Sequence, residues 1–214
     1  MATVLKWPLT NQELSEVLDE NGQYRFAASL SEYWGLLSEV PYRVDFIDNQ
    51  IIASISYESD LHSHLAAELG FFLKTVFSNN KQYRVYNSNR PVFVEDCKGL
   101  GTGIFNADGM VTTLPAQRYE YQKGMSAEMN PMVVIEILST STRAYDFATK
   151  LPCYKSTSTL QTILFVERDQ PKIFFSERVA TNQWLETVLT KADDTIVIDG
   201  KMLSLSELYR EVYF

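Results

Sequence analysis

The stretch "MVVIEILSTSTRAYDFATK", residues Met132 to Lys150, begins as an apolar run that contains a single glutamate. Successive side chains of a strand point to opposite faces, so Val134, Glu136 and Leu138 share one face. A glutamate in a sheet can point to solvent, but both faces of this run are otherwise apolar. An isolated buried carboxylate is costly unless a partner compensates its charge. The stretch therefore predicts a buried strand whose glutamate has a partner.

The polar half of the stretch reads as a loop that leads into a helix, with Pro152 marking an irregularity in that helix. Asp146 and Lys150 are four residues apart, which places them on one helix face. They form either an ordinary surface ion pair or part of a site. A further carboxylate, Asp108, interrupts the apolar run "IFNADGMV". An aspartate before glycine is also typical of a turn, so both interpretations stay open.

Two carboxylates on neighbouring strands and a nearby lysine would form a divalent-metal site with a cationic partner. Mg²⁺ prefers hard oxygen ligands, commonly one or two protein carboxylates together with water and phosphate oxygens. The lysine could orient or deprotonate a water, or stabilise the charge that develops on a phosphate. Phosphodiester hydrolysis needs these elements and little else.

The N-terminal part of the chain is expected to be helical. Thr10 or Asn11 can cap a first helix, and Ser29-x-x-Glu32 has the spacing of a capping box. Residues 1–40 therefore read as a peripheral helical extension of a single domain that spans residues 1–214.

The remainder of the chain alternates strands and helices. Asp48-Asn49 predicts a hairpin turn, and leucines at steps of four from Leu61 to Leu73 predict a long helix. "YRVYNSN" and "PVFVE" read as two strands, "IFNADGMVTTL" and "PMVVIEIL" as further strands, and "QRYEYQKGMSAEMN" as an excursion between these two. "QTILFVE", "PKIFFSE" and "QWLETVLT" are rich in β-formers, and "SLSELYREV" closes the chain as a short helix. This order predicts an α/β (α+β) fold with a central mixed sheet.

Charge and composition limit the possible functions. The formal net charge of −8 and pI of about 4.8 argue against a protein that coats nucleic acid non-specifically. They are compatible with an enzyme whose acidic pocket is neutralised by a divalent metal. The apolar runs are far shorter than the ~20 residues of a membrane span, and "MATVLKWPLTNQEL" does not resemble a secretory signal. Cys97 and Cys153 suggest neither a disulfide framework nor a zinc site, so we expect a reducing, cytoplasmic setting.

The stretch from which we started also resembles a known family. The pattern "vvEvlSpst…D…K…Y" is typical of the Uma-type putative restriction endonuclease family, within the PD-(D/E)XK nuclease superfamily. The resemblance extends from about Tyr42 to Glu167. The segment "VVIEILSTSTRAYDFATKLPCY" supplies the residues of that pattern at the family spacing: Glu136, Ser139, Asp146, Lys150 and Tyr154.

Other parts of the family pattern are present with substitutions. The hairpin "YRVDFIDNQII" has Asp45 where the family usually has glutamate and Asn49 where it has glycine. The helix "HSHLAAELGFFL" begins at His62, as the family helix begins with histidine. In "NADGMV", Ala107 replaces the proline of a Pro-Asp motif, and the aspartate is retained as Asp108.

The resemblance implies a restriction-endonuclease-like fold, with helices flanking the mixed sheet. It assigns Asp108 and Glu136 to the binding of Mg²⁺ or Mn²⁺, and Lys150 to water activation or transition-state stabilisation. In the wider superfamily this lysine lies two residues after the glutamate, where this chain has Leu138. Asp45 becomes an auxiliary carboxylate near the metal, while His62 and Asp146 become supporting residues.

Two functional hypotheses follow. The first is a metal-dependent endonuclease that hydrolyses DNA phosphodiester bonds and, by family analogy, forms a homodimer. The alternative is a catalytically decayed, non-enzymatic dimeric module that binds or regulates on the same fold. The changes at Asp45 and Ala107 favour the alternative, whereas Asp108, Glu136 and Lys150 favour the enzyme. For His62 a surface or capping role competes with a chemical one, and Ser139 has no histidine paired with it in sequence and is expected to cap a helix.

Overall fold

A computed structural model of the chain describes residues 9–55 and 59–212. Its helices are α1 (Asn11–Val17), α2 (Leu30–Leu37), α3 (Asp60–Phe77), α4 (Arg143–Tyr145), the π-helix η1 (Asp146–Lys150), α5 (Leu151–Ser156) and α6 (Leu205–Leu208). Its strands are β1 (Gln23–Ala27), β2 (Arg43–Ile47), β3 (Gln50–Ser54), β4 (Tyr83–Val94), β5 (Gly103–Thr113), β6 (Arg118–Gln122), β7 (Met125–Glu128), β8 (Pro131–Leu138), β9 (Thr162–Glu167), β10 (Ile173–Ala180), β11 (Gln183–Leu189), β12 (Thr195–Ile198) and β13 (Lys201–Ser204).

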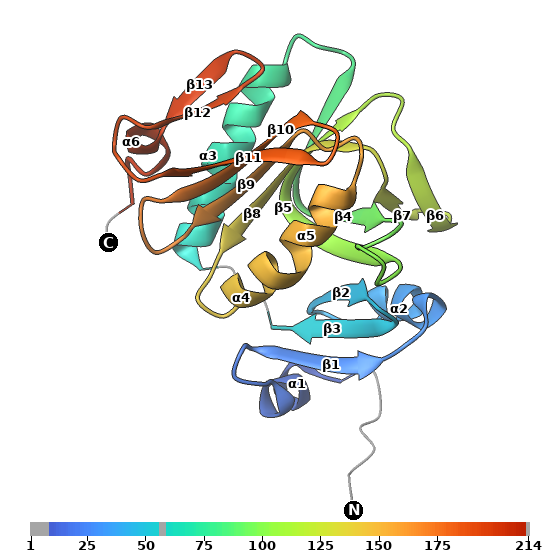
Figure 1. The fold of residues 1–214 in the computed structure, drawn as a ribbon. Coiled ribbons are helices and arrows are strands. Elements are labelled where there is room, and N and C mark those ends of the chain that lie inside the picture. The colour runs from blue at the N-terminus through green and yellow to red at the C-terminus, as the bar shows by residue number, and fades with distance from the viewer. Residues whose placement is uncertain (1–8, 56–58, 213–214) are drawn as a thin grey trace, which may run out of the picture.

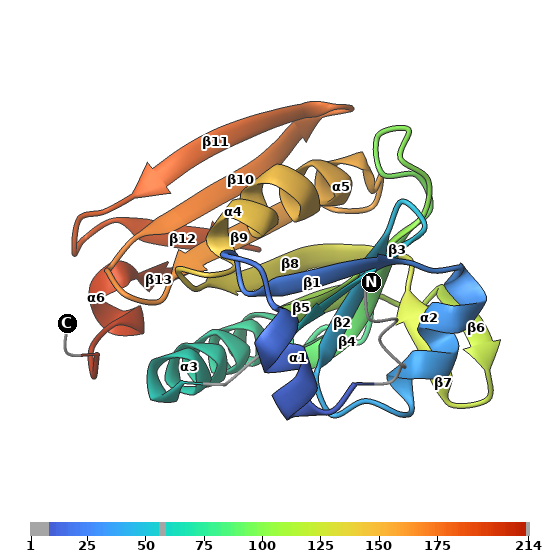
Figure 2. The same ribbon diagram turned by 90° about the horizontal axis from the view of Figure 1, so that it is seen from below.

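A mixed sheet forms the centre of the molecule (Figure 1). Its main path runs β1-β3-β2-β5-β8-β9-β10-β11, and β4, β7 and β6 extend it from β5. Helix α3 covers one face, while α4, η1 and α5 cover the other (Figure 2). The predicted fold, a central mixed sheet flanked by helices, is confirmed. Among the helices of the described residues, none is both long and apolar enough to cross a membrane.

Strand β8 is buried on both faces, as its apolar run predicts. Val133, Ile135 and Ile137 pack into the cluster that includes α3. On the opposite face, Val134 and Leu138 pack beneath α5. Glu136 shares that second face and is only 2% exposed. The glutamate is therefore aimed toward the helical segment that follows it in sequence.

The hairpin and the long helix form where the sequence predicts them. Asp48 and Asn49 both have positive φ, 52° and 53°, the backbone conformation that a tight two-residue hairpin turn requires. The N-terminus of α3 is capped by Ser59, whose side chain accepts a hydrogen bond from the His62 N–H. The leucines that predicted this helix face the core, with Leu65, Leu69 and Leu73 fully or almost fully buried.

The central feature of the sheet is that β5 changes partner along one edge. It pairs with β4 along nearly its whole length on one side. On the other side it pairs with β2 at Gly103–Ile104 and with β8 at Gly109–Thr112. In the described structure, residues 105–108 between these two regions pair with neither strand. Strands β2 and β8 therefore diverge around this part of β5 and leave room for side chains.

Several elements differ from the sequence-based expectation. The helical extension predicted for residues 1–40 contains a strand, β1, which pairs antiparallel with β3 and joins the main sheet; residues 1–8 lie outside the described part. The segments "YRVYNSN" and "PVFVE" form the single strand β4, with an irregularity in its register. The hairpin of β6 and β7 and the hairpin of β12 and β13 were not predicted as paired strands. In each case the partner strand, rather than local propensity, decides the conformation.

The cysteine prediction was wrong. Cys97, in the loop after β4, forms a disulfide with Cys153 of α5, and their Cα atoms are 4.5 Å apart. The spacing of the two cysteines along the chain, 56 residues, gives no hint of this contact. Only the packing of α5 against β4 brings them together. Because the two cysteines are paired, they no longer support the expectation of a reducing setting.

Candidate functional site

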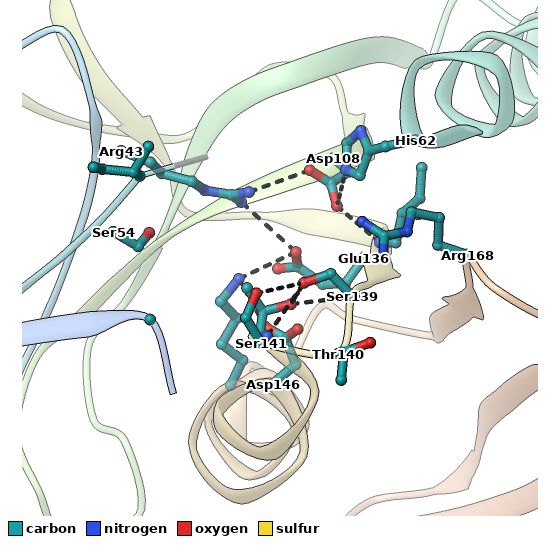
Figure 3. A pocket seen from close by; sticks show the side chains of 15 residues that line it. Arg43, Ser54, His62, Asp108, Glu136, Ser139, Thr140, Ser141, Asp146 and Arg168 are labelled. Carbon is teal, nitrogen blue, oxygen red and sulfur yellow. Dashed lines mark hydrogen bonds and ion pairs between the residues drawn. The ribbon is translucent and has the colours of Figure 1, made fainter. Parts of the chain in front are cut away.

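A cavity of about 320 Å³ opens where β2 and β8 diverge (Figure 3). Its floor carries charged side chains from several elements, and its rim carries the hydroxyl-rich segment that follows β8. The lining residues are Gly22, Arg43, Ser54, Ile55, His62, Asp108, Glu136, Ile137, Ser139, Thr140, Ser141, Thr142, Asp146, Lys150 and Arg168. Residues predicted separately from "NADGMV" and from "VVIEILSTSTRAYDFATK" therefore line one cavity.

Asp108 lies in the part of β5 that neither β2 nor β8 covers. Its Oδ2 accepts a hydrogen bond from the Ile137 N–H at 2.8 Å and lies 3.4 Å from Nε2 of His62. Its Oδ1 lies 3.3 Å from Nη1 of Arg43. Burial raises the pKa of this carboxyl, but Arg43, His62 and the Ile137 N–H outweigh it and hold the pKa well below its usual range. Asp108 is therefore a carboxylate at neutral pH.

Glu136 has the opposite pKa shift. Its Oε1 accepts a short hydrogen bond of 2.6 Å from the Tyr154 hydroxyl. Its Oε2 lies 3.2 Å from Nζ of Lys150 and 3.7 Å from Nη2 of Arg43. Burial, aided by the neighbouring Asp108 charge and opposed by Lys150 and Arg43, raises the pKa of Glu136 to about 8. The surrounding cations therefore do not fully compensate this carboxylate.

Lys150 reaches the cavity from the π-helix η1. The Leu151 N–H bonds to the carbonyl of Asp146, five residues back, and Pro152 has no N–H with which to continue an α-helix ladder. Lys150 Nζ lies 3.1 Å from Asp146 Oδ1, 3.2 Å from Glu136 and 3.8 Å from Asp45 Oδ2. Burial alone would lower the pKa of Lys150, but Asp146 and Glu136 raise it above its usual range. The side chain is 4% exposed and carries a buried ammonium group.

Asp45 is buried beside the cavity rather than in its lining, and its hydrogen bonds come from neutral donors. Its Oδ1 accepts hydrogen bonds from the backbone N–H and the side-chain amide of Asn106, at 3.0 and 3.1 Å. Its Oδ2 accepts one from the Tyr145 hydroxyl at 3.3 Å. The Asn106 N–H belongs to the unpaired part of β5, so Asp45 satisfies a backbone donor that the ladder leaves open. Through Lys150 it also contributes charge to the cavity.

The structure assigns different places to the supporting residues. His62 lies in the first turn of α3 and contacts Asp108 in the cavity. Asp146 is buried and pairs with Lys150, so the surface ion pair is excluded. Ser139 accepts a hydrogen bond from the Thr142 N–H as the chain enters the helical segment. The N-cap of α4 is Thr142, so Ser139 makes a local contact in the turn before this helix and is not its capping residue.

Sequence reasoning missed Arg43 and the two tyrosines of the site. Arg43 precedes Asp45 by two residues on a strand, so both side chains point to the same face; this spacing was the available signal. Tyr154 matches the final tyrosine of the family pattern, but the sequence assigned it no role. Tyr145 carried no signal, because its contact with Asp45 joins residues 100 positions apart.

The charged side chains of the cavity have the chemistry to hold a divalent cation. The described residues contain no cluster of three or more histidine, cysteine or acidic side chains at metal-binding distances. Two carboxylates, Asp108 and Glu136, suffice for Mg²⁺, which usually keeps several water ligands. Four buried carboxylates face two cations, Arg43 and Lys150. With Glu136 ionised and His62 counted as neutral, this leaves an excess of two negative charges, which matches one divalent cation. Because the pKa of Glu136 is raised to about 8, cation binding near neutral pH would release a proton from it.

Comparisons with known proteins identify the family and the fold of the chain. A sequence model of the Uma2 family, described as putative restriction endonuclease, matches residues 30–205. The uncharacterized protein sll1609 of Synechocystis is 25% identical over 160 residues, which cover 74% of this chain and 85% of that protein. A crystal structure described as a putative nuclease belonging to DUF820, from Anabaena variabilis, matches with a TM-score of 0.59 and 16% identity. The match covers 83% of this chain and 97% of the chain in that structure, and the two have the same fold. The chain belongs to the Uma2 family, the putative restriction endonucleases.

Proposed function

We propose that this protein is a divalent-metal-dependent endonuclease that hydrolyses DNA phosphodiester bonds, with Mg²⁺ or Mn²⁺ as cofactor. One observation carries the proposal: Asp108 and Glu136, buried on adjacent strands, line the same cavity, with the Lys150 ammonium 3.2 Å from Glu136. Membership of a nuclease family supports nucleic acid as the substrate class.

Asp108 and Glu136 would hold the cation. Each has one oxygen fixed by a neutral donor, the Ile137 N–H for Asp108 and the Tyr154 hydroxyl for Glu136. These bonds orient both carboxylates toward the cavity. When bound, the cation would supply Lewis-acid chemistry to the scissile phosphate and its attacking water.

Lys150 is suited to electrostatic stabilisation. Because its pKa is raised, it remains an ammonium at neutral pH and cannot accept a proton from water. Of the two roles predicted for it, we therefore infer the stabilisation of negative charge that develops on the phosphate, together with orientation of the water. Asp146 and Asp45 position this ammonium, and His62 positions Asp108.

Cleavage of supercoiled plasmid in Mg²⁺ or Mn²⁺ tests the proposal. Asp108→Asn and Lys150→Met should each lower the nicking rate by at least about 100-fold, the typical cost of removing a transition-state charge contact. Lys155→Met is the matched control, because Lys155 lies on the next turn and pairs with Glu186 outside the cavity. Asp193→Asn, at an exposed position, controls for the loss of a carboxylate.

The opposite result would favour the decayed binding or regulatory module. Wild type and all variants would then be equally inert in both metals, and neither metal would change the melting temperature. The homodimer rests on family analogy alone, and we keep it as part of the proposal. Light scattering on the purified protein would test it by giving either the monomer mass of 24.5 kDa or twice that value.

A further inference from the structure

Arg43 lines the cavity and reaches from β2 toward both central carboxylates. Its guanidinium lies between Asp108 and Glu136, with Nη1 3.3 Å from Asp108 Oδ1 and Nη2 3.7 Å from Glu136 Oε2 (Figure 3). The opposite oxygens of the two carboxylates are already bonded to Ile137 and Tyr154. Arg43 therefore contacts the oxygens that point into the cavity, which are the ones a shared cation would need.

The arginine is held by charge more than by fitted hydrogen bonds. Well-matched arginine–carboxylate pairs have two parallel bonds of about 2.7–2.9 Å, and both contacts of Arg43 are longer. Its Nε and Nη2 are shielded from solvent and have no hydrogen-bond partner among the described residues. The side chain is 17% exposed, so one side of it faces open space. A bridging group that is held mainly by charge can be displaced by a cation of higher charge that binds the same two carboxylates.

Arg43 and a divalent cation would compete for these oxygens. Both would neutralise the same pair of carboxylates, and two cations within a few ångströms in a buried site repel each other strongly. Lys150 also contacts Glu136 Oε2, at 3.2 Å, but among the described residues Arg43 is the cation that contacts both Asp108 and Glu136. We propose that Arg43 is a displaceable internal counterion: it neutralises Asp108 and Glu136 when no divalent cation is bound, and it competes with that cation for them. Arg43 thereby sets the metal concentration at which the site fills. This inference rests on the proposed metal site.

Titration calorimetry with MnCl₂ alone tests this inference at pH 8.5, where a proton on Glu136 interferes least. Arg43→Gln should bind Mn²⁺ about tenfold or more tightly than wild type, because the competitor is removed. Arg43→Met, which keeps the length of the side chain, is the second variant in case the first does not fold. Arg168→Gln is the matched control, because it removes an arginine from the same cavity that pairs with Asp169 rather than with the site carboxylates. Its affinity for Mn²⁺ should rise far less than that of Arg43→Gln, because the charge that it removes does not contact the site carboxylates.

The outcomes separate this inference from the proposed function. If wild type binds Mn²⁺ and both Arg43 variants bind it equally or more weakly, the counterion role is wrong and the metal site stands. If only the Arg43 variants bind Mn²⁺, the inference is supported in its strongest form. If none of the proteins binds Mn²⁺, the metal site itself is wrong and the inference falls with it. A second readout is the rise in melting temperature on adding MnCl₂ to protein freed of metal with EDTA, which should be larger in Arg43→Gln than in wild type.

Discussion

At the scale of single residues, the pKa values of Asp108 and Glu136 are shifted in opposite directions within the same cavity. Asp108 gains a guanidinium, an imidazole and a backbone N–H, and its pKa falls. Glu136 is buried beside Asp108, and its pKa rises to about 8 despite two nearby cations. The difference shows that Arg43 and Lys150 can fully compensate one central carboxylate but not both.

These shifts predict a pH dependence of stability. A carboxyl with a raised native pKa stabilises the fold fully below its unfolded pKa, and this contribution is lost as pH rises toward about 8. Without metal, the unfolding free energy of wild type minus that of Glu136→Gln should therefore fall between about pH 5 and 8, by at most about 1.4 kcal/mol per pH unit. Urea unfolding in EDTA measures this difference, and its slope is insensitive to any constant cost of the substitution.

Asp108→Asn provides the contrast. The stabilising contribution of Asp108 is present above its unfolded pKa and disappears only as the solution becomes strongly acidic. The ionisation of Asp108 itself therefore adds no slope between pH 5 and 8. The unfolding free energy of wild type minus that of Asp108→Asn should vary less over this range than the difference for Glu136→Gln, because Asp108 contributes only part of the raised pKa of Glu136. A flat curve for Glu136→Gln would show that the pKa of Glu136 is not raised in the native protein.

Tyr154 carries the third prediction. Its hydroxyl donates to Glu136 at 2.6 Å, and its ring packs edge-on against Phe105. Tyr154→Phe keeps the packing and removes the bond that orients the carboxylate. We expect a loss of about 10- to 100-fold in metal affinity or cleavage rate, as is typical for groups that orient metal ligands. Tyr121→Phe, which loses a hydroxyl near the surface, should leave both unchanged, and an unaffected Tyr154→Phe would show that Glu136 is oriented without it.

At the scale of elements, two irregularities build the site. The change of partner along β5 leaves the backbone around Asn106 and Asp108 open, and the side chains of Asp45 and Asp108 bind the N–H groups that this exposes. The π-turn of η1 places Lys150 over the same gap. Pro152 predicted an irregularity in the helical segment that contains η1. Nothing in the sequence predicted the partner change along β5, because it depends on where the other strands lie.

The disulfide gives an element-scale prediction. It joins the loop after β4 to α5, the helix that carries Tyr154, and closes a long loop of chain. Cys97→Ala/Cys153→Ala should lower the unfolding free energy by about 2–4 kcal/mol, as loss of a native disulfide usually does. Denaturant unfolding of wild type with and without dithiothreitol provides the parallel measurement. If the oxidised and reduced proteins are equally stable, the two cysteines are not paired in solution.

At the scale of the whole molecule, the net charge of −8 limits how DNA can be bound. The cavity itself has more carboxylates than cations, so it repels phosphate until a cation fills it. We expect the affinity for a fluorescently labelled duplex to be at least about tenfold weaker in EDTA than in Ca²⁺, with a shallow salt dependence because an acidic protein makes few phosphate contacts. Fluorescence anisotropy at several salt concentrations measures both quantities. Equal affinity in EDTA would mean that DNA binds to a surface other than this cavity.

The sequence by itself determined the buried strand of Glu136, the hairpin at Asp48-Asn49, the long helix and the fold class. Each of these follows from a periodicity or a turn signal that neighbouring residues carry. Only the tertiary structure decided that β1 joins the sheet, that Cys97 meets Cys153 and that Arg43 bridges Asp108 and Glu136. These contacts join residues far apart in the chain, and they exist because β2, β5, β8 and the η1–α5 segment converge at one place. Local sequence patterns cannot encode that convergence, which is set by how the strands pair.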